Sequence, residues 1–163
     1  DAIWSNLAIT KERKNIFAFS TPYMKGKQVI MVHTDSPIKT KADLAGTKVI
    51  VEKGSVGEQV VRALNDSQAP AEIVASSEVM GTGRQLFASD AHALIYDNLA
   101  VEYYVANSAG KLRIVDDPLS EDDIGVAVRP LDTELLGKFN KSLTAMQADG
   151  SIERIHANWF TRK

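Results

Sequence analysis

Few side chains in this sequence are arranged for catalysis. The three histidines, His33, His92 and His156, have no carboxylate or second histidine at a metal-ligand spacing such as four residues, so no metal site is expected. His92 and Asp97 bracket an expected strand, but their odd spacing sends the two side chains to opposite faces, which argues against an acid–base dyad. Cysteine, a Gly-x-Ser-x-Gly elbow and a Walker loop are all absent from the sequence. We therefore expect no catalytic residue, no metal and no cofactor.

Two positions could bind an anion. Residues 52–58 read as a strand end, a Gly/Ser turn and a helix start, and the N–H groups at such a helix N-terminus attract negative charge. Arg13 stands in an expected first helical turn. Taken alone, the first pattern favours an ordinary tight turn and a lone arginine favours a solvated side chain. Only a wider motif would make either position functional.

Composition bounds the class of protein. Of 163 residues, 44% are apolar and 25% are charged, as in ordinary globular chains. The net charge of −2 gives no electrostatic basis for binding nucleic acid or an anionic membrane. The longest apolar stretches have about five residues, against the roughly 20 that a membrane helix needs.

Short β-branched runs alternate with helical patterns, which predicts an α/β fold with parallel strands. The expected strands are Gln28–His33, Lys48–Glu52, Glu72–Ala75, His92–Tyr96, Arg113–Val115 and Ile124–Val128. The expected helices are Gly57–Asn65, Val79–Ala88, Asn98–Ala106 and two C-terminal helices. The first of these two has an apolar stripe (Leu135, Phe139, Leu143, Met146) between an Asp132 N-cap and Gly150, and the second has Ile152, Ile155 and Trp159 on one side.

Turns and charges mark the organisation of the chain. Two turn-rich joints, at 34–37 and 116–120, bracket a central block that could be a domain of its own. Basic residues gather between 11 and 27 and acidic residues between 116 and 123. We expect both clusters to be solvated.

A wider motif covers the whole chain. Asp1-Ala2-Ile3-Trp4 leads to Ile9-Thr10-Lys11-Glu12-Arg13 and then to Phe19-Ser20-Thr21-Pro22-Tyr23. Further matching stretches follow in order at 38–49, 52–55, 93–97, 124–128 and 143–160. In these segments the chain resembles the bacterial extracellular solute-binding proteins for polar amino acids, the ligand-capturing components of ABC importers. The resemblance implies a type II periplasmic-binding-protein fold, here with one complete lobe and part of a second.

The resemblance also implies a site for an amino acid on which two lobes close. Arg13 matches the arginine that holds the α-carboxylate through two parallel hydrogen bonds, and Asp97 matches the aspartate that takes the α-ammonium. The turn at Ser55, Val56 and Gly57 matches contacts to the same carboxylate, Val56 through its backbone N–H. The predicted ligand-binding residues are Ser5, Asn6, Ala8, Arg13, Ser55, Val56 and Asp97.

Three positions depart from the pattern of the family. Ala8 stands where a Thr or Ser hydroxyl commonly adds a carboxylate hydrogen bond, worth roughly 1.5–3 kcal/mol. Asn6 stands where Gly or Ser is usual and would project an amide toward the ligand, favouring a different ligand. His92 replaces a frequent Asp.

The chain opens directly on Asp1-Ala2-Ile3-Trp4, without a methionine or a signal peptide. Family members begin with two further strand–helix units, which include an aromatic residue that stacks on the ligand. We therefore divide the chain into residues 1–28 (part of lobe 1), 29–117 (a complete lobe 2) and 118–163 (the C-terminal part of lobe 1). We expect a fragment, or a fold completed by a second chain or a swapped protomer, because apolar faces and strand edges would otherwise be exposed.

The functional prediction is a non-enzymatic, amino-acid-binding protein that acts in the periplasm or outside the cell, with a lipid anchor if the source is Gram-positive and a signal peptide in its precursor. It would deliver a polar amino acid to ABC permease subunits by hinge closure near 25–29 and 115–120. Two alternatives stay open: a ligand-sensing domain of a histidine kinase or chemoreceptor, and a cyclohexadienyl-dehydratase-like enzyme with Asp97 and Glu102 as the obvious acids. A glutamate-receptor-like channel is excluded, because its pore would interrupt the chain after Tyr23. The sequence names neither the amino acid nor the oligomeric state.

Overall fold

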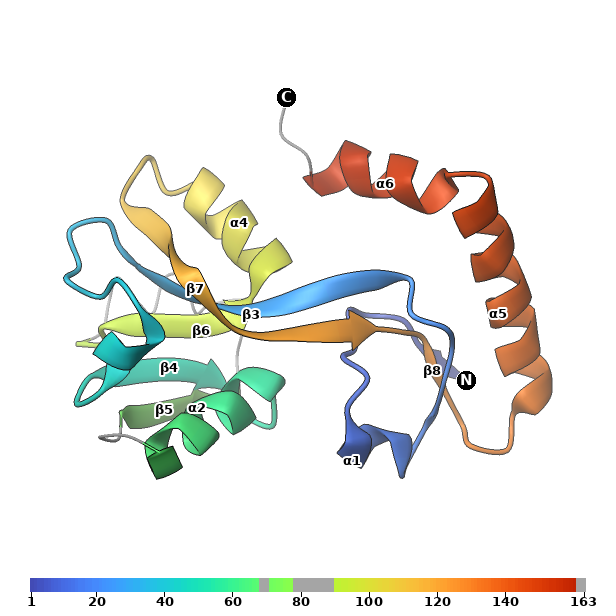
Figure 1. Ribbon diagram of the computed structural model, residues 1–163, viewed down its shortest axis with the longest axis horizontal. Helices are drawn as coiled ribbons and strands as arrows, with labels where there is room; N and C mark the ends of the chain where they lie inside the picture. The colour runs from blue at the N-terminus through green and yellow to red at the C-terminus, as the bar shows by residue number, and fades with distance from the viewer. Residues whose placement is uncertain (68–70, 78–89, 161–163) are drawn as a thin grey trace. The chain divides into compact units, whose positions relative to one another are not determined.

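The computed structural model describes residues 1–67, 71–77 and 90–160 (Figure 1). The chain forms two compact units: unit 1 consists of residues 1–26 and 122–163, and unit 2 consists of residues 27–121. Two strands, β3 (Met24–His33) and β7 (Leu112–Ile124), carry the chain across the two boundaries. The sequence places these boundaries after residues 28 and 117, whereas the units divide after Gly26 and Glu121.

Unit 2 contains a five-stranded sheet in the order β5-β4-β6-β3-β7. Strand β4 (Lys48–Glu52) runs parallel to both β5 (Glu72–Ser76) and β6 (Ala93–Asp97), as predicted. Strand β3, however, runs antiparallel to β6. The expectation of parallel strands is therefore wrong for β3, which brings the chain in from unit 1 and lacks the helical crossover that keeps neighbouring strands parallel.

Strands β4 and β6 at the centre of this sheet are buried on both faces, as the continuously apolar runs at 49–51 and 93–95 predict. One hydrophobic cluster contains Ile95 and Val61 of helix α2 (Val56–Ser67), and the other contains Leu94 and Val101 of helix α4 (Asn98–Ala106). Neighbouring strand residues point to opposite faces. Helix α2 therefore covers one face of the sheet and α4 the other (Figure 1).

Strand β7 is longer than the sequence predicts. Its 13 residues include 116–120, where the Asp-Asp-Pro pattern predicts a turn. Proline has no backbone N–H to donate to a neighbouring strand. Pro118 is tolerated in β7 because β7 lies at an edge of the sheet and has an unpaired side. Asp117 accepts a hydrogen bond of 2.9 Å from the backbone N–H of Lys41, the first residue of a 3-10 turn, η1 (Lys41–Leu44). Pairing at the sheet edge and the hydrogen bond between Asp117 and Lys41 outweigh the local preference of this segment for a turn.

The basic and acidic clusters meet on the strands that cross the boundaries. Lys25 Nζ lies 2.7 Å from a carboxylate oxygen of Asp123, and Lys27 Nζ lies 3.6 Å from one of Glu121. All four side chains remain exposed, so the expectation that most residues of the two clusters are solvated agrees with these ion pairs. Because the side chains are largely exposed, each pair contributes only about 0–1 kcal/mol.

The predicted helices are confirmed wherever the structure describes them. Helix α5 (Thr133–Ala148) begins after Asp132, whose carboxylate accepts from the N–H of Leu135 at 3.2 Å. Gly150, with φ of +71°, has the left-handed conformation of a residue just beyond a helix, and α6 (Ser151–Phe160) follows it. The helix predicted at Val79–Ala88 lies outside the described residues.

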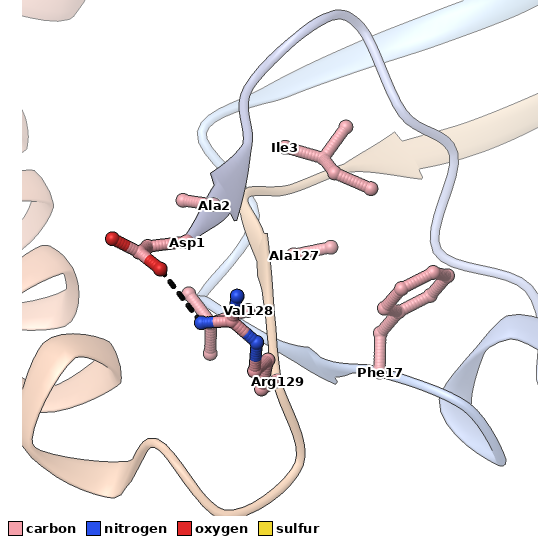
Figure 2. Close-up of a pocket in the computed structure, with 7 residues that line it drawn as sticks. All are labelled: Asp1, Ala2, Ile3, Phe17, Ala127, Val128 and Arg129. Atoms are coloured by element: carbon pink, nitrogen blue, oxygen red, sulfur yellow. Dashed lines mark hydrogen bonds and ion pairs between the residues drawn. The ribbon is translucent and has the colours of Figure 1, made fainter.

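Unit 1 has little core of its own. Its antiparallel sheet has the order β1-β8-β2, formed by Ala2–Ile3, Ala127–Val128 and Ala18–Phe19 (Figure 2). The predicted strand Ile124–Val128 is thus split, since β7 ends at Ile124 and β8 begins at Ala127. Within the described part of the chain, both clusters of buried hydrophobic residues lie in unit 2. No helix of that part is long and apolar enough to cross a membrane.

Candidate functional site

Arg13 lies on a single helical turn, α1 (Lys11–Lys14), in unit 1. Thr10 caps this turn, because its hydroxyl oxygen accepts from the N–H of Arg13 at 3.2 Å. One guanidinium nitrogen, Nη1, donates to the carbonyl of Ala8 at 3.0 Å. Among the described residues, no carboxylate lies within 4.0 Å of the guanidinium. A half-buried arginine is thus held in place on one side, with donors left for an anion.

The segment before Arg13 positions it. Ala8 is buried and forms a bridge with Ile124, and the N–H of Ile9 donates to the carbonyl of Asp123 at 2.8 Å. Asn6 has φ of +53°, a conformation that favours glycine and, among other residues, asparagine. The backbone conformation therefore suits asparagine at this position. Ser5 and Asn6 are exposed, and their contact with a ligand stays a prediction.

The start of helix α2 carries the anion-binding features that the Gly/Ser turn suggests. Ser55 Oγ accepts from the N–H of Glu58 at 3.1 Å, and Glu58 Oε2 accepts from the N–H of Gly54 at 2.7 Å. The backbone N–H groups of Val56 and Gly57 have no acceptor among the described residues. These two groups at a helix N-terminus are available to a carboxylate.

Glu58 is a positioning residue that the sequence reasoning overlooked. The Ser-x-x-Glu spacing from Ser55 to Glu58 is a helix-start signature that could have revealed it. Arg62 also binds the carboxylate of Glu58, with Nη2 at 2.7 Å from Oε1. A β-carbon on Gly57 would lie 2.8 Å from Gln28 Oε1 and 3.3 Å from Ile95 Cγ2. A larger residue at position 57 would therefore have to displace the side-chain amide of Gln28 and shift Ile95 slightly.

The Glu58 contacts predict an acid-sensitive helix start. The N–H of Gly54 first, and then Arg62, lower the pKa of Glu58. Because the pKa is depressed, the stabilisation is complete above the ordinary glutamate value of about 4.3 and is lost as the pH falls through the folded-state pKa. We expect the amide NMR signal of Gly54 to titrate with a midpoint below that value. The Glu58→Gln variant should show no such titration, and a midpoint at or above 4.3 in the wild type would contradict the assignment.

Asp97 ends strand β6 and caps α4, its carboxylate accepting from the N–H of Leu99 at 3.0 Å. Burial raises the pKa of the neighbouring Tyr96 to about 12, and the charges of Glu52 and Asp97 add to the effect. Glu52 and Asp97 are the last residues of the adjacent parallel strands β4 and β6. The ends of these strands therefore form a negatively charged environment suited to a cation, to which Glu52 contributes although the sequence reasoning did not select it.

His92 takes no part in this environment. It precedes β6, at the other end of the strand from Asp97, and its Nδ1 accepts from the N–H of Lys48 at 3.1 Å. The described residues contain no group of three His, Asp or Glu side chains placed to hold a metal ion.

The candidate residues fall into two sets. Unit 1 holds Ser5, Asn6, Ala8 and Arg13, which lie on one continuous segment. In unit 2 the helix start at Ser55 and Val56 lies near the strand end at Asp97. Gln28 links the two, because it pairs with Asp97 in the sheet and its side-chain oxygen lies 2.8 Å from where a β-carbon on Gly57 would stand. The first set can bind an anion, and the second can bind an anion and a cation.

Comparisons with known proteins identify the family of this chain. Residues 1–162 match the family described as bacterial extracellular solute-binding proteins, family 3. The ABC transporter glutamine-binding protein GlnH of Bacillus subtilis (strain 168) is 30% identical over 162 residues, and ABC transporter arginine-binding protein 1 of Escherichia coli (strain K12) is 27% identical over 164 residues. Each alignment covers 98% of this chain, but only 58% and 66% of the relative. The chain thus spans about three fifths of the length of these curated relatives.

Solved structures give the same result. An ancestral arginine-binding protein bound to glutamine has a TM-score of 0.89 at 32% identity, covering 99% of this chain and 72% of that one. A mutant of ArgBP from T. maritima has a TM-score of 0.89 at 32% identity, covering 99% of this chain and 69% of that one. The predicted α/β fold of the type II periplasmic binding proteins is confirmed. The chain belongs to family 3 of the bacterial extracellular solute-binding proteins.

Proposed function

We propose that this chain binds a polar amino acid and delivers it to the permease subunits of an ABC importer. The observation that carries the proposal is Arg13. Its guanidinium is half-buried, is anchored by the carbonyl of Ala8, and has no carboxylate partner among the described residues. A guanidinium with unoccupied donors fits the α-carboxylate of an amino acid, which it can bind through two parallel hydrogen bonds.

Unit 2 supplies the complementary groups in this proposal. Asp97 takes the α-ammonium, in the negative environment that it shares with Glu52. The N–H groups of Val56 and Gly57 add hydrogen bonds to the α-carboxylate. The lobes are residues 1–28 with 118–163 and residues 29–117, and they close on the ligand through the strands that join them, β3 and β7.

The ligand class follows from the relatives. Those named above are described as glutamine-binding and arginine-binding, and a further relative from Escherichia coli (strain K12) as L-cystine-binding. Ala8 supplies no hydroxyl to the carboxylate, so Arg13 and the helix start bind it in this chain. Delivery to a permease places the protein in the periplasm or at the outer face of the cell, with a signal peptide in the precursor and a lipid anchor if the source is Gram-positive.

The test compares intact amino acids with analogues that lack one charged group. Arginine, glutamine and cystine are titrated against the chain, alone and extended by the part of T. maritima ArgBP that it does not cover. Binding is followed by calorimetry and by thermal stability. We expect at least one of the three to bind, and its decarboxylated and N-acetylated analogues to bind at least tenfold more weakly. Absence of binding in both forms of the chain would refute the proposal.

One neighbour favours a second candidate function. An ancestral amino acid-binding protein, described as a precursor of cyclohexadienyl dehydratase, has a TM-score of 0.84 at 30% identity. The same fold could therefore carry an elimination reaction in which Asp97 or Glu102 acts as the acid. Incubation with prephenate and arogenate, with product measured by absorbance, decides this candidate. Turnover that is lost in Asp97→Asn would replace the binding function by the enzymatic one.

A further inference from the structure

The start of strand β6 is joined to the start of β4 through a histidine side chain. The N–H of His92 donates to the carbonyl of Lys48 at 2.8 Å, and the N–H of Lys48 donates to Nδ1 of His92 at 3.1 Å. The regular pairing of the two strands begins at the next residue of each, where Val49 lies opposite Ala93. In a parallel ladder a backbone carbonyl normally accepts from the N–H of the neighbouring strand. The imidazole of His92 therefore takes the place of a carbonyl at this end of the sheet.

Only a neutral imidazole can accept this hydrogen bond. A neutral histidine ring has one donor nitrogen and one acceptor nitrogen, whereas the protonated ring has two donors. With a proton on Nδ1, two donors would face each other at the N–H of Lys48, and the ring of His92 would have to turn away. Histidine is the side chain that ordinarily takes up a proton between about pH 5 and 8. The hydrogen bond between the two strand starts is therefore sensitive to mild acid.

Three charged side chains of the described residues lie beside this hydrogen bond. Lys48 Nζ is 2.6 Å from a carboxylate oxygen of Asp90 and 3.4 Å from one of Glu72, which lies on the neighbouring strand β5. The hydrogen bond from Lys48 lowers the pKa of Asp90, and the charge of His92 adds to this effect. Asp90 is therefore a carboxylate throughout the range in which histidine changes its charge. It can accept from a protonated ring, while Lys48 keeps its contact with Glu72.

We propose that His92 is a pH-sensitive clasp between the starts of β4 and β6. When neutral, it accepts from the N–H of Lys48; when protonated, it releases this N–H and turns its ring toward the carboxylate of Asp90. The same two strands end at Glu52 and Asp97, so mild acid loosens the sheet at the end opposite the candidate site. One contact is lost as the pH falls and another is gained, so the effect is read at the Lys48 amide and not in the stability of the whole chain.

The test follows both nitrogen atoms of this hydrogen bond by NMR on the isotope-labelled chain, from about pH 8 to 5. At the upper end of the range His92 should carry its proton on Nε2, because Nδ1 is the acceptor. As the pH falls, we expect the amide signal of Lys48 to shift with the same midpoint as the imidazole signals of His92. The hydrogen-exchange protection of this amide, corrected for the intrinsic effect of pH, should fall at least fivefold over the range because its acceptor is lost.

Variants separate the acceptor role of His92 from its charge. His92→Asn supplies a side-chain oxygen that accepts but does not titrate, so the Lys48 amide should stay protected over the whole range. His92→Ala removes the acceptor, so the same amide should be poorly protected at both ends of the range. His156→Asn is the matched control, because His156 is an exposed histidine on α6 of unit 1, and it should titrate like the wild type. No amino acid is present, so failure of the proposed ligand binding does not affect these results.

Three results would overturn the proposal. The first is a Lys48 amide that stays constant while the imidazole of His92 titrates. The second is a neutral His92 that carries its proton on Nδ1, because this nitrogen would then be a donor. The third is a Lys48 titration that persists in His92→Asn, because the carboxylates of Asp90 and Glu72 would then be its source.

Discussion

Replacing Arg13 with alanine is expected to abolish amino-acid-induced stabilisation of this protein. The guanidinium has donors without a carboxylate partner among the described residues, and Thr10 and the Ala8 carbonyl fix its half-buried position. Removing one partner of a desolvated, hydrogen-bonded charge pair costs roughly 2–5 kcal/mol. The affinity should therefore fall between about thirtyfold and several thousandfold, as measured by calorimetry with the amino acid that binds the wild-type chain.

Two controls separate binding from folding in this experiment. Lys14→Ala removes the same charge from the same helical turn at an exposed position, and it should leave the affinity within about twofold. Arg13→Lys keeps the charge but loses the planar pair of donors, so its affinity should lie between those of the wild type and Arg13→Ala. An Arg13→Ala variant that binds as tightly as Lys14→Ala would remove Arg13 from the site.

Replacing Ile95 with alanine is expected to have the largest effect on stability. Ile95 is fully buried on β6, the strand between β4 and β3, and it contacts the position of Gly57 at the start of α2. Large-to-small substitutions of this kind cost about 2–5 kcal/mol, because the lost burial adds to the cavity left behind. Urea unfolding followed by circular dichroism should show a lower midpoint with an unchanged slope, and the slope multiplied by the midpoint shift gives this loss of unfolding free energy.

Val74→Ala provides the comparison for Ile95→Ala. Val74 lies on β5 of the same sheet but keeps 39% of its surface exposed. Its truncation removes fewer contacts and should cost less than about 1 kcal/mol. If the two variants lose the same stability, the core of unit 2 is not centred on β6.

Local patterns predicted the elements of unit 2 because each is also supported by its surroundings. The apolar run at 49–51 and the bounds Lys48–Glu52 are confirmed in β4, and the predicted helix Asn98–Ala106 is confirmed in α4. In both cases the propensity of the segment and the burial of its side chains favour the same structure. The helix start at Ser55 was also predictable, since strand, Gly/Ser turn and helix follow one another directly.

What the sequence did not predict depends on partners distant along the chain. The Asp-Asp-Pro pattern of 116–118 is a sound turn signal, but the sheet edge makes it a strand. Strand β3 runs antiparallel to β6 because the chain enters β3 from unit 1 and not through a helix of unit 2. Glu52 gains its electrostatic role only because β4 and β6 are neighbours, a pairing that joins residues more than forty positions apart. No local window contains that information.

The division into units also has a consequence for the order of folding. Unit 2 is one continuous segment, whereas the two pieces of unit 1 are separated by all of it. Closing so long a loop in an unfolded chain costs conformational entropy before any contact is gained. Once β3 and β7 are neighbours in the folded sheet of unit 2, the chain leaves it at adjacent points, and the N–H of Tyr23 donates to the carbonyl of Ile124 at 3.0 Å. We therefore expect unit 2 to fold first and to act as a template for unit 1, so that in stopped-flow refolding a mutation that slows the folding of unit 2 also delays unit 1.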